Sequence, residues 1–204
     1  MLRFVTAALL LVAGYVLGAS GVVPDLWRQL LESATASATQ TATNAPVANV
    51  EYSYDRPPPD QLIPAQVVSI TDGDTFRALI GNQNVPIRMS DFDAPERDQP
   101  YGAEATAALA TLLSGGVVQL ENRGSGGFGR TAARVFVGEA DVNFEMVRRG
   151  AGWFDPEYAK DEELFIVENA ARDARLGLWA LPLDKRVEPW VWRRLSKDLK
   201  AKRR

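Results

Sequence analysis

The sequence predicts an α+β domain in which five short strands form a small β-barrel and helices follow at its C-terminal end. Two observations support this prediction. Between residues 63 and 137, short runs of β-branched and apolar residues are separated by turns rich in glycine, asparagine and aspartate, which is typical of strands. One Ala/Leu-rich stretch, residues 103–113, interrupts this pattern after the third run and indicates a helix.

The predicted elements follow one another in a defined order. Strands are expected at residues 66–70, 75–80, 85–89, 117–122 and 131–137. Asn143 is expected to cap a short helix that ends at Gly150. A longer helix is expected over residues 161–176, where Leu164, Val167, Ala171 and Ala174 recur at spacings of three or four. Five strands with a helix between the third and the fourth is the order of an OB-fold barrel.

Two further regions precede the predicted barrel. In residues 1–23, Arg3 is followed by an uncharged, mostly apolar run, which predicts a hydrophobic helix that is either a signal peptide or a transmembrane anchor. Either reading predicts export, with the domain membrane-anchored and facing the periplasm or the extracellular side, or secreted after cleavage. Residues 24–62 are low in large apolar side chains and end in a proline-rich run, which predicts a disordered linker.

Charge is distributed unevenly along the chain. Residues 1–62, 63–180 and 181–204 carry net charges of −2, −7 and +6. A domain of net charge −7 repels a polyanion at long range, so binding of nucleic acid would require a local basic cleft or the C-terminal segment. Residues 181–204 form a basic tail containing Trp190 and Trp192, suited to nucleic acid or to anionic lipid, although a solvated terminus has the same composition.

The chain contains neither cysteine nor histidine. Disulfides, thiolate nucleophiles, histidine bases and zinc sites built from cysteine or histidine are therefore excluded. Carboxylates and arginines remain as the candidate groups, and they point to a hard cation with oxygen ligands and to an anionic substrate.

Three short motifs hold such groups. The first is Asp72-Gly73-Asp74-Thr75, the second combines Arg88 with Asp93 and Glu96, and the third places Arg130 after a glycine-rich loop. Each motif taken alone is also typical of an ordinary surface turn.

Taken in order, the motifs resemble the staphylococcal nuclease family. The likeness extends over residues 66–180 and includes Tyr101-Gly102-x-Glu104-Ala105 and Gly127-Phe128-Gly129-Arg130-Thr131. The closing Pro189-Trp190-x-Trp192-Arg193 is similar to tails of bacterial members. The resemblance implies a Ca²⁺-dependent nuclease that hydrolyses DNA or RNA by in-line attack of water. The products would be 3′-phosphate and 5′-hydroxyl ends.

The resemblance also implies the metal ligands. Asp74 and Asp93 would bind Ca²⁺ through their carboxylates and Ala94 through its backbone carbonyl, while Thr75 would order a metal-bound water. Family members often have threonine where this chain has Ala94, but a carbonyl ligand tolerates that change. The oxygen donors suit Ca²⁺.

The catalytic roles implied are those of Glu96, which would activate the attacking water, and of Arg88 and Arg130, which would hold the phosphate and its transition state. The loop Ser125-Gly126-Gly127-Phe128 departs from the family pattern and is expected to be more flexible. Candidates for stacking on nucleotide bases, alternatively core or rim aromatics, are Trp153, Phe154 and Tyr158.

Two other functions remain open on the sequence alone. The first is a catalytically inactive OB-fold module that binds nucleic acid or protein, although such a module would be expected to lose one of the three catalytic side chains. The second is an adaptor that acts through the basic tail. No obligate protein partner is inferred.

Overall fold

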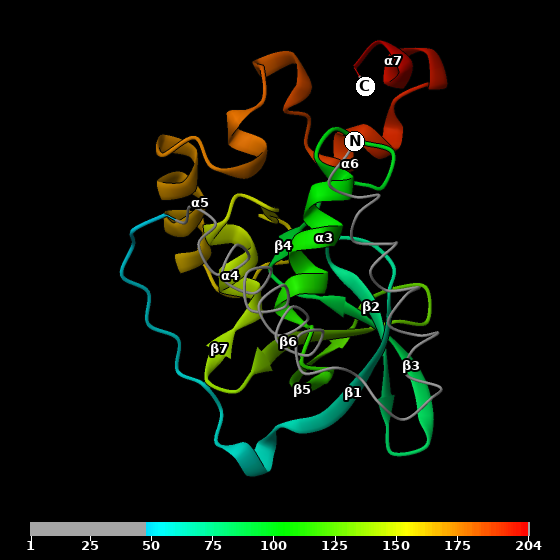
Figure 1. Cartoon of the computed structure of the whole chain (residues 1–204), viewed down its shortest axis with the longest axis vertical. Helices are drawn as coiled ribbons and strands as arrows, with labels where there is room; N and C mark the ends of the chain where they lie inside the picture. The colour runs from blue at the N-terminus through cyan, green and yellow to red at the C-terminus, as the bar shows by residue number, and fades with distance from the viewer. Residues whose placement is uncertain (1–47, 204) are drawn as a thin grey trace, which may run out of the picture. The chain divides into compact units, whose positions relative to one another are not determined.

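The computed structural model describes residues 48–203, and in it five strands close into a barrel (Figure 1). They are β1 (Ile63–Ile70), β2 (Thr75–Ile80), β3 (Gln83–Met89), β5 (Val117–Ser125) and β6 (Thr131–Val137). Neighbours in the order β3-β2-β1-β5-β6 pair antiparallel, and a parallel pairing of β3 with β6 closes the barrel. The predicted α+β class and five-stranded barrel are confirmed.

The strands form because their side chains alternate between the barrel interior and its outer face. On β2, Phe76 and Ala78 are buried, and on β3 Ile87 and Met89 are buried while Arg88 between them is only partly covered. The predicted bounds of β2 and β6 agree with the structure to the residue. The other three strands extend beyond their predicted bounds because pairing with neighbours continues through residues 63–65 of β1, 83–84 of β3 and 124–125 of β5.

Three helices cover the barrel core. They are α3 (Gly102–Leu112), α4 (Val142–Arg148) and α5 (Glu163–Asp173). Ala105 and Leu109 of α3, with Val142 and Met146 of α4 and Leu164 and Val167 of α5, are buried in the same cluster as the strand residues. Ala174 is exposed, contrary to the predicted apolar face, because α5 ends at Asp173.

The predicted cap of α4 is wrong. Asp141 caps this helix, with its side chain accepting a hydrogen bond from the Phe144 backbone N–H at 3.1 Å. Asn143 lies in the first turn and is buried. Its side chain accepts from the Val135 backbone N–H at 2.9 Å and donates to the Ser90 carbonyl at 2.8 Å, so it joins α4 to β6 and to the end of β3.

Residues 48–62, which the sequence analysis placed in the linker, lie against the domain. The Ala48 backbone N–H donates to the Arg148 carbonyl at 3.1 Å, and the Tyr52 ring stacks on Phe144 at a centroid distance of 4.3 Å. The segment runs along the outside of the barrel and reaches β1 through the short helix η1 (Pro59–Gln61) (Figure 1). Tyr52 and Tyr54 anchor this segment to the domain, although its low apolar content does not predict such packing.

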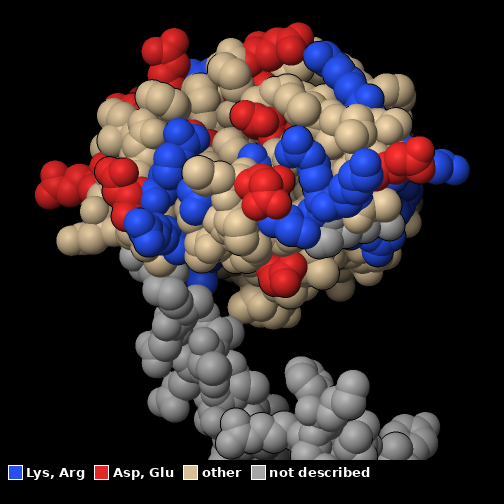
Figure 2. All heavy atoms as spheres, turned by 90° about the horizontal axis from the view of Figure 1, so that it is seen from above, with Lys and Arg blue, Asp and Glu red and all other residues tan. Residues whose placement is uncertain are grey.

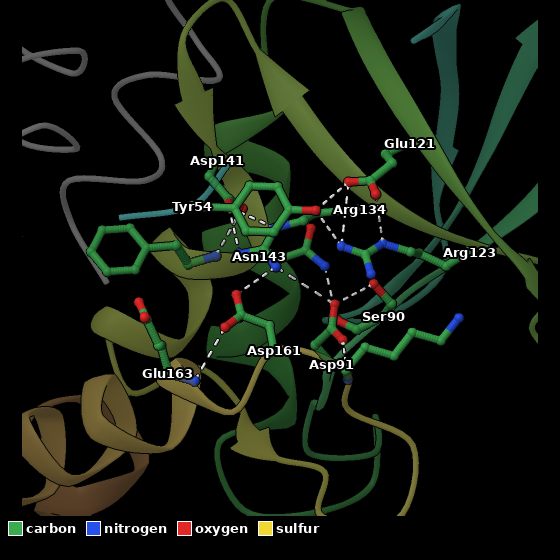
Figure 3. A network of polar contacts seen from close by, with 12 residues as sticks. Tyr54, Ser90, Asp91, Glu121, Arg123, Arg134, Asp141, Asn143, Asp161 and Glu163 are labelled. Atoms are coloured by element: carbon green, nitrogen blue, oxygen red, sulfur yellow. Dashed lines mark hydrogen bonds and ion pairs between the residues drawn. The ribbon is translucent and has the colours of Figure 1, made fainter. Parts of the chain in front are cut away.

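These anchors meet a buried arginine on β6. The Arg134 side chain is 0% exposed and bonds to Asp141 at 2.6 Å and to Asp161 at 2.7 Å. The Tyr54 ring covers the guanidinium at 3.6 Å, and the Tyr52 hydroxyl also contacts it. Figure 3 shows this group, here called the Arg134 cluster, where β6, the residues after β3 and the chain before α5 meet.

The C-terminal segment is also packed against the domain. It comprises η2 (Gly177–Ala180), η3 (Leu183–Lys185), α6 (Pro189–Arg194) and α7 (Lys197–Arg203). Trp179 of η2 is buried, and within the basic tail Trp192 is also buried, so this part of the tail is not a solvated terminus. Gly177 crosses the end of α4 so closely that a Cβ atom on it would lie 2.3 Å from the Gly150 carbonyl oxygen. Both glycines have positive φ, 55° and 66°, which favours glycine at each.

The predicted N-terminal hydrophobic helix, residues 1–23, lies outside the described residues, as does most of the predicted linker. Among the helices of residues 48–203, none has the length and apolar character that crossing a bilayer requires.

Candidate active site

The turn between β1 and β2 buries the first predicted metal ligand. The side chain of Asp74 is 2% exposed, and its Oδ2 accepts a hydrogen bond from the Ala94 backbone N–H at 2.7 Å. Gly73 permits this approach, because a Cβ atom there would lie 2.7 Å from Ala94 Cβ. Thr75 donates its hydroxyl to Asp74 Oδ1 at 2.9 Å. The turn is therefore fixed against the Ala94 segment rather than exposed as a surface hairpin.

Arg88 joins the two predicted metal carboxylates. One nitrogen of its guanidinium contacts Asp74 Oδ1, and the other donates to Asp93 Oδ1 at 2.7 Å. Asp93 is 1% exposed and stands on the short strand β4 (Phe92–Asp93), four residues after β3 ends. Burial raises the pKa of the Asp74 carboxyl to about 7, although the Arg88 charge opposes the shift. The two acids are thus held together by one arginine and are largely shielded from water.

Glu96 lies on the turn that leads into α3. Gly102, the first residue of that helix, packs so tightly on this turn that a Cβ atom on it would lie 2.0 Å from the Glu96 carbonyl oxygen. The Glu96 side chain is 34% exposed and reaches toward Asp93. Both carboxylates contact the same residue, Arg193 of α6, at 2.7 Å each. Three predicted residues, Asp74, Asp93 and Glu96, are thus linked by two guanidinium groups.

Arg193 was not among the predicted site residues. Its motif, Pro189-Trp190-x-Trp192-Arg193, resembled a tail of the family but carried no role. One hundred residues separate Arg193 from Asp93, so no local pattern could indicate this contact. The one signal of this contact in the sequence was a basic residue, Arg193, next to an aromatic residue, Trp192.

Arg130 is the predicted residue that the structure does not bring into contact with the others. Its Nε donates to the carbonyls of Gly126 and Gly127 at 3.2 Å each, within its own loop. The loop nevertheless lies beside Arg88, because Thr131 and Ala132 pair with Ile87 and Arg88. A rotation of the Arg130 side chain away from the loop carbonyls is needed before it can act with Arg88.

The three predicted stacking residues have different surroundings. Trp153 is buried and packs edge-on against Trp179 at 4.4 Å, so its ring is a core residue. Phe154 is partly buried, and the Tyr158 side chain is largely exposed. The strand β8 (Trp153–Phe154) pairs with β4, which sets Trp153 directly opposite Asp93. The segment is therefore adjacent to the site, and Phe154 and Tyr158 remain candidates for base contacts.

The donor atoms fit a hard cation in type. Two buried carboxylates, a hydroxyl and backbone carbonyls are the oxygen ligands that Ca²⁺ prefers. In the arrangement seen here, however, both Asp93 oxygens accept from Arg88 or Arg193, and both Asp74 oxygens accept from Arg88, Thr75 or Ala94. Consistent with this, no cluster of three or more acidic side chains in residues 48–203 is arranged around a metal position. Arg88 and Arg193 thus place two positive charges against these carboxylates, which opposes the approach of a metal cation.

The surface around the site carries charges of both signs. In Figure 2, which looks onto the end of the domain with α6 and α7, Lys and Arg side chains lie interspersed with Asp and Glu side chains. An anionic ligand approaching this end would meet local basic groups in a domain of net negative charge.

Several known proteins are similar in sequence to this chain. A family model described as staphylococcal nuclease homologue matches residues 86–181. The micrococcal nuclease of Shigella flexneri is 37% identical over 144 residues, which cover 65% of this chain and 82% of that protein. An uncharacterized endonuclease of Haemophilus influenzae is 34% identical over 133 residues, covering 65% and 74%. A staphylococcal-like nuclease of Arabidopsis thaliana is 33% identical over 108 residues, covering 53% and 33%. The chain therefore belongs to the staphylococcal nuclease family.

Proposed function

We propose that this protein is a Ca²⁺-dependent nuclease that hydrolyses phosphodiester bonds of DNA, RNA or both. One observation carries the proposal: a single guanidinium, that of Arg88, bridges Asp74 and Asp93, with Glu96 beside them. These residues come from the β1–β2 turn, strand β3, strand β4 and the turn before α3, and Arg88 and Arg193 link their side chains. The nuclease names of the relatives support the same reaction class.

The proposed division of labour follows from the side chains. Asp74, Asp93 and the Ala94 carbonyl would hold the ion, with Thr75 ordering its water. The bound ion would supply Lewis-acid stabilisation of the negative charge on phosphate. Glu96 is the most exposed of the three carboxylates and would accept the proton of the attacking water.

The arginines would bind the substrate. Arg88 already faces the carboxylates, and its planar, permanently charged fork suits a phosphate with two oxygens to contact. Arg130 would join it after turning from its loop, where the flanking glycines permit movement. Attack of water in line with the leaving 5′ oxygen would break the P–O5′ bond, leaving a 3′-phosphate and a 5′-hydroxyl.

The test is cleavage of fluorescent single-stranded DNA and of a matching RNA by the full chain, with Ca²⁺ present and with Ca²⁺ chelated. We expect cleavage only with Ca²⁺. In Glu96→Gln we expect a rate lower by about a hundredfold or more, the effect of losing a general base, with folding unchanged. Glu162→Gln, an exposed residue at the start of α5, is the matched control and should cleave normally.

Three results would contradict parts of the proposal. Normal cleavage by Glu96→Gln would show that Glu96 is not the general base. Cleavage that persists when Ca²⁺ is chelated would show that the reaction does not depend on Ca²⁺. No cleavage of either substrate would favour the inactive binding module, a function with which the side-chain position of Arg130 is also compatible.

Export of the protein is a separate proposal. It is supported by the apolar run of residues 4–23 alone. Cell fractionation, with and without residues 1–23, would distinguish a membrane-anchored protein from a secreted one. Loss of export on deletion is expected for both.

A further inference from the structure

The C-terminal helix α6 places a positive charge between two residues of the active site. Arg193 Nη2 donates to Asp93 Oδ2 and Nη1 donates to Glu96 Oε1, each at 2.7 Å, and Nη1 also contacts Asp93 Oδ1 at 3.3 Å. The guanidinium therefore contacts one predicted metal ligand and the predicted general base at the same time.

This position is set by packing and not by the arginine alone. Trp192, the preceding residue, is fully buried, and its indole N–H donates to Asp98 Oδ1 at 2.9 Å. The Gln99 side chain donates to the Val187 carbonyl just before α6. Both partners lie in the turn that begins at Glu96, so α6 is fastened to the segment whose carboxylate Arg193 contacts.

Arg193 is the donor best able to withdraw. Its side chain is 47% exposed, whereas that of Arg88 is 19% exposed and stands on a barrel strand. A guanidinium that is half in water loses less on leaving its partners, because water replaces the hydrogen bonds. If the Arg193 guanidinium moves away, Asp93 Oδ2 and Glu96 Oε1 each lose the hydrogen-bond donor that they have within residues 48–203.

We propose that Arg193 is a further residue of the active site that sets its metal affinity. In the metal-free protein its guanidinium pairs with both Asp93 and Glu96, and a divalent cation must compete with it for Asp93. The two cations compete for one carboxylate, so the arginine weakens metal binding and keeps Glu96 engaged until the metal is bound. This inference rests on the proposed metal site at Asp74 and Asp93.

The experiment measures Ca²⁺ binding by calorimetry to the full chain without nucleic acid. The proteins are the wild type, Arg193→Gln and Arg194→Gln, the last an exposed neighbour on the same helix with the same charge. Loss of a competing, half-exposed ion pair should lower the Kd of Arg193→Gln roughly three- to tenfold. Arg194→Gln should change the Kd by less than about twofold, because it alters only the long-range field. The Ca²⁺ concentration for half-maximal cleavage should fall in Arg193→Gln by a similar factor.

The outcomes separate this inference from the proposed function. An unchanged or higher Kd in Arg193→Gln, with Ca²⁺-dependent cleavage by the wild type, would overturn the competition and leave the nuclease intact. An equal decrease in both variants would also overturn it, because general charge would then explain the effect. If none of the proteins binds Ca²⁺ and none cleaves, both the proposed function and this inference fail. Circular dichroism of each variant verifies that the change in α6 has not unfolded the domain.

Discussion

Two regions of this domain use the same residue types for different ends. In the Arg134 cluster, one arginine meets Asp141, Asp161 and, at 3.8 Å, Asp91 (Figure 3). In the candidate active site, Arg88 and Arg193 meet Asp74, Asp93 and Glu96. Each region gathers three carboxylates around guanidinium groups. They differ in exposure, since Arg134 is covered by two tyrosine rings and Arg193 is half exposed.

The difference shows what enclosure does to an ion pair. When a fully buried pair loses one partner, an uncompensated charge stays in a medium of low polarity. When a half-exposed pair separates, water and ions replace the partner at small cost. The Arg134 cluster is thus suited to fixing residues 48–62 and the start of α5 to the barrel. The candidate active site, where Arg193 is half exposed, can release that arginine at a smaller cost.

The largest effect is expected from breaking the enclosed cluster. Arg134→Met should lower the free energy of unfolding by about 3–5 kcal/mol, because Asp141 and Asp161, each only 11% exposed, lose their cation in a largely enclosed place. Urea unfolding followed by circular dichroism measures this. Arg194→Met, on the surface, is the control and should change the value by less than about 0.5 kcal/mol. A loss below about 1 kcal/mol for Arg134→Met would show that the cluster contributes no more than a surface pair.

A second variant tests whether Arg130, beside the candidate active site, affects the rate of DNA cleavage and not the stability of the domain. Arg130→Lys keeps the charge but loses the planar fork, so kcat/KM for DNA should fall about tenfold or more. The unfolding free energy should stay within about 0.5 kcal/mol, because the hydrogen bonds of Arg130 are made within its own loop. Full activity in Arg130→Lys would make Arg130 an ordinary surface charge.

The smallest effect concerns the cover of the enclosed cluster. The Tyr54 hydroxyl donates to Glu121 at 2.6 Å and accepts from Arg123, so Tyr54→Phe removes both hydrogen bonds while Arg123 and Glu121 stay paired, and it keeps the ring over Arg134. We expect a loss of about 0.5–1.5 kcal/mol in unfolding free energy. Tyr158→Phe removes a hydroxyl from an exposed ring and should have no measurable effect. Equal effects of the two changes would mean that the hydrogen bonds of the Tyr54 hydroxyl with Glu121 and Arg123 add nothing measurable to the free energy of unfolding.

Much of the barrel was predictable because its signals are local. The strands 75–80 and 131–137 are short apolar runs between strong turn residues, and pairing neither lengthens nor shortens them. The α4 cap was assigned wrongly because Asp141 and Asn143 are both good caps two residues apart. The apolar pattern does not decide between them. What decides is the buried contact of Asn143 with Val135 and Ser90.

The site was predictable only where order along the chain identified it. Asp74, Arg88, Asp93 and Glu96 lie within 23 consecutive residues; Arg88 contacts both aspartates, and Glu96 is joined to them through Arg193. The contact of Arg193 with Asp93 depends on the packing of Trp192 and on the path of the chain through η2 and η3. The docking of residues 48–62 depends likewise on Arg134, far along the sequence. Long-range contacts of this kind leave no periodic pattern to read.

The crossing of Gly150 and Gly177 has a consequence for how this family can diverge. A Cβ atom at either position would lie 2.3 Å from a backbone oxygen, so a single replacement of either glycine pushes apart the two segments that meet there. Everything from η2 to α6 follows that point. Lineages that retain an arginine at the position of Arg193 are therefore expected to retain both glycines. In lineages that lose one of these glycines, the residue at the position of Arg193 should be free to vary.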